Sequence, residues 1–111
     1  MTVYIVWENW FVYNDEFKQE EQIDARIIGV FDSQVEANKC IERAINTRVN
    51  KLKICHQDFL EPYGGLRLVT SSEDSSSSVS LTRPDLDNRL LVKYKYNMTE
   101  FVLGQDLELG V

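Results

Sequence analysis

The chain has 111 residues, with 12 Lys and Arg against 18 Asp and Glu, and a formal net charge of −6 at pH 7. This length predicts a single domain, which can bury roughly two-thirds of its unfolded surface without disulfides or metals. The acidic balance argues against nucleic acid or an anionic membrane as a partner, because neither would be attracted by charge.

Two cysteines, Cys40 and Cys55, are the only thiols in the chain. Residues 1–8 lack the basic start and cleavage site of a secretory signal, so the cysteines predict reduced thiols in an intracellular, cytoplasmic protein. No apolar run approaches the roughly 20 residues that a membrane-spanning helix needs.

The first predicted element is a strand over residues 2–13. Both of its alternating sets of side chains are apolar, namely Val3, Ile5, Trp7 and Phe11 on one side and Tyr4, Val6, Trp10 and Val12 on the other. A strand with this pattern is expected to lie inside its sheet and to be covered on both faces.

A polar stretch over residues 14–24 follows, with five acidic residues and one lysine. We interpret it as the loop of an antiparallel hairpin that leads into a second strand at 25–31. Phe17 is its one large apolar residue, and Gly29 in the second strand indicates a bulge or a close approach by another segment.

A helix is predicted over residues 33–53. Ser33 and Glu36 match the capping box S-x-x-E, which satisfies free backbone N–H groups at a helix start. The residues that follow form an apolar stripe with helical spacing, made of Ala37, Cys40, Ile41, Ala44, Ile45, Val49 and Leu52.

The second half of the chain predicts a hairpin and a long last strand. Short strands at 66–70 and 79–81 flank the serine-rich segment 71–78, which is too polar to offset its ordering entropy and is predicted to be a mobile loop. Residues 89–102 alternate between an apolar and a basic face, as in a half-covered strand. The apolar residues of the tail, 101–111, are expected to dock on the body or on a second copy.

Together these elements predict an α+β fold, a mainly antiparallel sheet with one long amphipathic helix on one face. The arrangement resembles a group of small uncharacterised strand–strand–helix domains over residues 3–45. The matching segments are Tyr4 to Glu8, the acidic loop, Ile28 to Ser33, and Glu36-Ala37-Asn38. The resemblance implies a fold and no activity, because these domains have none assigned.

Cys55, His56 and Asp58 are the residue types of a nucleophile, a base and an orienting acid. Triad partners usually meet through the fold and are not neighbours in sequence, so a hydrolase-like enzyme using Cys55 and His56 is the least favoured hypothesis. We predict no catalytic, cofactor or metal site, since three or four ligands at suitable spacing are lacking.

We therefore expect a non-enzymatic protein–protein interaction or regulatory module, which can form a homodimer. A small acidic inhibitor, such as a virus encodes to block a basic site on a target protein, is the alternative. The predicted partner contacts are acidic and aromatic: Asp15, Glu16, Phe17, Glu20, Glu21 and Trp10.

Overall fold

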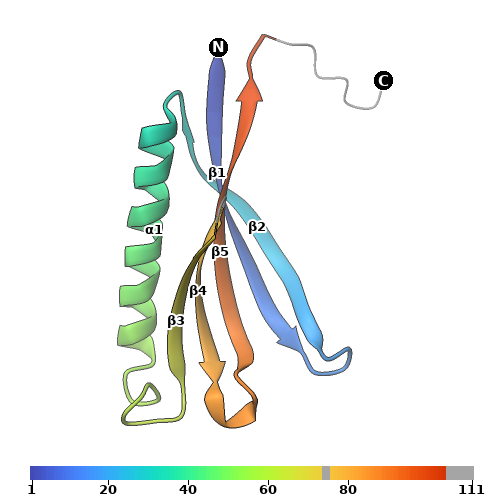
Figure 1. The fold of residues 1–111 in the computed structure, drawn as a ribbon, viewed down its shortest axis with the longest axis vertical. Coiled ribbons are helices and arrows are strands. Elements are labelled where there is room, and N and C mark those ends of the chain that lie inside the picture. Colours follow the sequence, from blue (N-terminus) through green and yellow to red (C-terminus); the bar gives the residue numbers. More distant parts are fainter. Residues whose placement is uncertain (74–75, 105–111) are drawn as a thin grey trace.

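The computed structural model describes residues 1–73 and 76–104, which form one antiparallel sheet and one long helix (Figure 1). In chain order the elements are β1 (Thr2–Asn14), β2 (Gln19–Phe31), α1 (Gln34–Cys55), β3 (Arg67–Glu73), β4 (Ser76–Arg83), the 3-10 helix η1 (Pro84–Leu86) and β5 (Arg89–Val102). The strands lie in the order β2-β1-β5-β4-β3. The predicted α+β fold is confirmed.

The β1–β2 hairpin has a much shorter loop than the sequence predicts. Its turn covers only residues 15–18, and residues 19–24 pair with β1 as part of β2. The side chain of Asn14 closes the turn, because its Oδ1 accepts hydrogen bonds from the backbone N–H groups of Glu16 and Phe17 at 2.9 and 3.2 Å. The predicted loop over 14–24 is therefore wrong for its second half. Residues 19–24 adopt strand conformation although they are mostly polar, because they pair with the long β1.

The helix α1 begins where its cap predicts. Ser33 is the N-cap, and its Oγ accepts a hydrogen bond from the backbone N–H of Glu36 at 3.4 Å. Ala37 and Leu52 of the predicted stripe are buried, and Leu52 packs with Val79 and Leu81 of β4 in the main apolar cluster. No helix in the described part of the chain is long and apolar enough to cross a membrane.

The serine-rich segment is largely a pair of strands. Residues 71–73 belong to β3 and residues 76–78 to β4, so the predicted loop over 71–78 is wrong there, and residues 74–75 lie outside the described residues. Ser77 and Ser78 pair with Tyr96 and Lys95 of β5. Backbone pairing with this long strand extends β4, although the serine side chains have little apolar surface to bury.

Only one face of the sheet is covered. The helix contacts β1, β2, β4 and β5 from one side, and no described element packs against the other (Figure 1). β1 does lie between two strands, but the prediction that both of its faces are covered is wrong for the described residues. The Cα radius of gyration is 16.6 Å, against about 13 Å for a compact domain of this length. Residues 105–111 of the predicted docking tail lie outside the described residues.

Gly29 lies beside a bulge, as its position in the strand predicts. Val6 pairs with Gly29 and Trp7 pairs with Ile27, so one residue of β2 is skipped. A Cβ atom at position 29 would lie 2.5 Å from the ring of Phe31 and 3.3 Å from Sγ of Cys40. The missing side chain is what lets the start of α1 lie close to β2.

We predict that Gly29→Ala lowers the free energy of unfolding by about 1–3 kcal/mol, because the added methyl group overpacks this contact. Urea unfolding followed by circular dichroism measures the change. Gly65→Ala is the control, since a Cβ at position 65 meets no atom within 4 Å. An equal loss in both variants would contradict the packing explanation.

Candidate functional site

A buried carboxylate joins α1 to three strands of the sheet. Glu8 of β1 is 9 % exposed. Its Oε2 accepts hydrogen bonds from the Tyr96 hydroxyl of β5 at 2.7 Å and from Arg48 Nη2 of α1 at 3.2 Å. Its Oε1 accepts one from Arg26 Nε of β2 at 2.9 Å. A charge this far from water needs such partners, so the cluster stabilises the position of the helix over the sheet.

The surroundings of Glu8 change its proton affinity and that of Tyr96. Burial raises the pKa of Glu8, but hydrogen bonds from Tyr96 and Arg48 and the charges of Arg48 and Arg26 outweigh burial, so the pKa of this carboxyl lies below its ordinary value. Burial, and then the bond to Glu8, raise the pKa of the Tyr96 hydroxyl well above its usual range. Glu8 is therefore ionised and Tyr96 neutral near pH 7.

The predicted contact residue Trp10 lies beside this cluster, on the helix side of the sheet. Its ring stacks on Tyr94 with centroids 5.7 Å apart, and the Arg48 guanidinium lies 3.9 Å from the Tyr94 centroid. These residues, with Asp24 and Arg26, line a cavity of about 210 Å³. Much of the Trp10 side chain is therefore in contact with residues of its own chain, although 38 % of Trp10 is exposed.

The other predicted contacts lie at the β1–β2 hairpin, where several acids have partners within the chain. Asp15 forms an ion pair with Arg89 at 3.5 Å, and Glu20 forms one with Lys93 at 3.5 Å. Glu21 accepts a hydrogen bond from Asn14 Nδ2 at 2.8 Å. Glu16 and Phe17 are exposed at the turn, Phe17 by 66 %. Part of the predicted acidic surface is therefore neutralised by two cations of β5, and the role of this surface in partner contacts stays a prediction.

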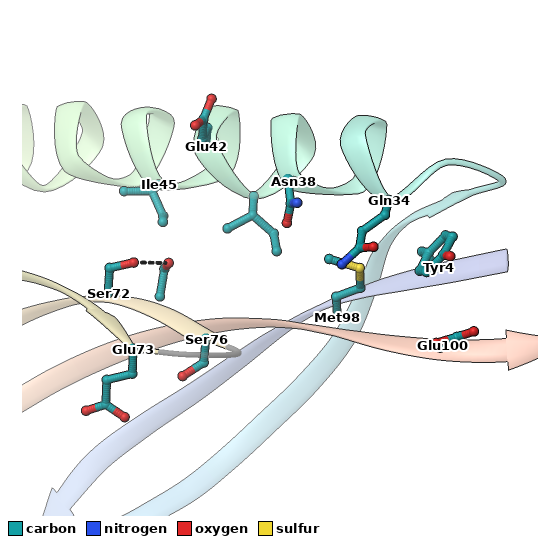
Figure 2. A pocket seen from close by; sticks show the side chains of 12 residues that line it. Tyr4, Gln34, Asn38, Glu42, Ile45, Ser72, Glu73, Ser76, Met98 and Glu100 are labelled. Carbon is teal, nitrogen blue, oxygen red and sulfur yellow. Dashed lines mark hydrogen bonds between the residues drawn. The ribbon is translucent and has the colours of Figure 1, made fainter.

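A larger cleft separates the first half of α1 from the β3–β4 hairpin (Figure 2). Its volume is about 600 Å³. The apolar part of its lining comes from three elements and consists of Ile41 and Ile45 of α1, Tyr4 of β1 and Met98 of β5. A second hollow of about 500 Å³ shares Glu42, Ile45, Ser72 and Ser77 with it and continues toward the edge strand β3.

The cleft carries negative charge that the described residues do not neutralise. Glu42, Glu73 and Glu100 are exposed in its lining, which holds no Lys, Arg or His, and none of the three forms an ion pair within residues 1–73 and 76–104. Glu73 also lines a smaller hollow together with Lys93 and Lys95, so the charge that remains without nearby cations is that of Glu42 and Glu100. In Figure 2 the side chains of Gln34, Asn38 and Ile45 point from α1 toward the sheet, whereas the carboxylate of Glu42 points away from the sheet and that of Glu73 points away from the helix. An apolar floor with acidic and amide groups around it is suited to a cationic ligand with an apolar stem.

Sequence reasoning missed this cleft. Its three carboxylates come from α1, β3 and β5, which are separate segments of the sequence. The nearest available signal was polar residues on the helix side of β3 and β4, such as Ser72 and Ser77, whose hydroxyls lie 3.2 Å apart. Small polar side chains at positions that face a helix leave space where larger apolar residues would fill it.

The structure does not bring Cys55, His56 and Asp58 into a hydrogen-bonded set. Cys55 ends α1 and is exposed, and His56 is the C-cap, with its backbone N–H bonded to Leu52 O at 3.0 Å. No hydrogen bond joins the three side chains within the described residues. No group of three or more His, Cys, Asp or Glu residues there could hold a metal ion.

No protein-family model, curated protein or solved structure matches this chain. The resemblance to small strand–strand–helix domains therefore stays a prediction.

We predict that Glu8→Gln lowers the free energy of unfolding at pH 7 by about 2–3 kcal/mol, because Arg48 is left without its charged partner. The loss is smaller than for a fully buried pair, since the Arg48 side chain keeps 19 % exposure. Urea midpoints at pH 7 measure it. Arg83→Gln, which breaks an exposed pair with Asp85, is the control and should lower the midpoint much less, because water solvates both charges.

The same group predicts a pH dependence. Because the folded-state pKa of Glu8 lies below the ordinary 4.5, its stabilisation is present above pH 4.5 and is lost as the pH falls through the lowered value. We expect the wild-type urea midpoint to fall more steeply between pH 5 and pH 3 than that of Glu8→Gln. Parallel curves for the two proteins would contradict a stabilising role for the ionised carboxylate.

Proposed function

We propose that this protein is a non-enzymatic interaction module whose cleft between α1 and the β3–β4 hairpin holds a basic segment of another protein. The observation that carries the proposal is that Glu42 and Glu100, which form no ion pair among the described residues, lie exposed in the lining of a cleft with an apolar floor. A lysine or arginine side chain matches both parts, because its aliphatic stem packs on apolar surface while its charged end meets a carboxylate.

The size of the cleft supports a short segment as the ligand. Its volume of about 600 Å³ lies within the range of roughly 300–1,000 Å³ that is usual for ligand pockets. The adjoining hollow runs along Thr70, Ser71 and Ser72 of the edge strand β3. An extended peptide entering there has free backbone groups of an edge strand beside it, which is a common mode of peptide recognition.

We predict that a fluorescent peptide of alternating lysine and leucine binds with an affinity that falls as salt is added, measured by anisotropy. The triple variant Glu42→Gln, Glu73→Gln and Glu100→Gln should bind about tenfold more weakly, since each exposed ion pair contributes roughly 0.2–1 kcal/mol. A peptide of alternating glutamate and leucine should not bind.

The matched control neutralises three acids at the hairpin instead, with Asp15→Asn, Glu16→Gln and Glu20→Gln. The cleft proposal expects this control to bind the lysine–leucine peptide as the wild type does. If the control loses affinity and the cleft variant does not, the acidic hairpin is the contact surface. If wild-type protein shows no saturable binding, the proposal is wrong for both surfaces.

A further inference from the structure

The second edge of the sheet, β2, has no neighbour on its outer side within the described residues. It is 13 residues long, and its polar groups toward that side are free to pair with another strand. Exposed apolar side chains follow the same edge, with Ile23 at 48 % and Ile27 at 51 % exposure. Short length and charged side chains usually protect edge strands from pairing with another chain. β2 carries charged side chains but is not short.

The charges on β2 are arranged symmetrically about one residue. Asp24 and Arg26 flank Ala25, and Ile23 and Ile27 flank those two in turn. Residues 24–27 pair regularly with β1 between two bulges, so this stretch is straight backbone at the edge. Asp24 and Arg26 pair with Trp10 and Glu8, which face the helix, and both are exposed.

We propose that two copies of the chain pair antiparallel through β2, with the two-fold axis at Ala25, to form one continuous sheet. In this register Asp24 of each copy lies opposite Arg26 of the other. Directly opposed charges of unlike sign stabilise neighbouring strands. The contact is isologous, because each copy contributes the same residues.

Neighbouring registers are worse for a physical reason. A two-fold axis perpendicular to the sheet places a residue on the axis opposite itself. Shifting the axis to Asp24 opposes two carboxylates, and shifting it to Arg26 opposes two guanidinium groups, and like charges directly opposite one another are destabilising. The axis at Ala25 instead opposes unlike charges twice, and both charged residues lie in the stretch 24–27 that pairs regularly with β1.

The two charged side chains beside Ala25 can still form hydrogen bonds across this contact. The Ala25 N–H donates to Oδ1 of Asp24 at 2.9 Å, and Asp24 is exposed. Pairing would bring this exposed carboxylate to Arg26 of the second copy. Arg26 retains donors for it, because its bond to Glu8 uses Nε, and its side chain is 62 % exposed.

The edge and the cleft are separate surfaces. No residue of β2 lines the cleft between α1 and the β3–β4 hairpin. Dimer formation therefore does not rest on the proposed function. A protein that binds the lysine–leucine peptide but stays monomeric would support the proposed function and contradict the dimer.

We expect the full chain, analysed by sedimentation across a dilution series, to reach twice the chain mass of 12.9 kDa. Asp24→Lys should raise the dimer dissociation constant by about tenfold or more, since it replaces two attractive pairs by two repulsive ones. Glu16→Lys makes the same change in charge at the hairpin turn and should leave the constant unchanged. A monomer at all concentrations, or a dimer equally weakened by both variants, overturns the proposal.

Two further variants test the register. Ala25→Pro removes the backbone N–H on the axis, which an edge strand tolerates, and should give a folded monomer. In a Cys55→Ser background, Ala25→Cys should cross-link under oxidation, because opposed residues lie about 5.5 Å apart between Cα atoms, within disulfide reach. Ile27→Cys is the control and should not cross-link. Cross-linking of Ile27→Cys, or of neither, overturns the axis at Ala25.

Discussion

The carboxylate of Glu8 is the contact on which the arrangement of layers depends. It lies within the sheet beneath the helix, and burying an ion is costly unless other groups replace its water. The replacements come from β2, β5 and α1 through Arg26, Tyr96 and Arg48. Because these groups must converge on two oxygen atoms, the cluster restricts both the height of the helix above the sheet and its rotation about its own axis.

The helix behaves differently on the two sides of Arg48. Toward its C-terminus, Val49 and Leu52 pack into the apolar cluster with β4. Toward its N-terminus, Ala37 is fully buried and Cys40 lies near Gly29 of β2. The first half of α1 thus packs against the β1–β2 side of the sheet. The cleft lies between this half of the helix and the β3–β4 hairpin (Figure 2).

The charge of the chain is distributed unevenly over these surfaces. The acidic hairpin faces Arg89 and Lys93, so its excess is partly neutralised within the chain. The carboxylates of the cleft have no such partners among the described residues. A net charge of −6 therefore says little about where a cationic group would be attracted, because local pairing decides the potential at each surface.

The amino-acid sequence by itself determined the elements that depend on neighbours in the chain. The cap at Ser33, the apolar stripe of α1, the alternation of β5 and the bulge at Gly29 all follow from residues within a turn or two, and all are present. Tertiary structure decided what depends on distant residues. Glu8 meets Arg48 and Tyr96 from 40 and 88 positions away, and the serine strands form because β5 pairs with them. The residue pattern of one segment indicates its backbone conformation and its apolar face. A buried charge or a cleft forms only when segments from separate parts of the chain meet.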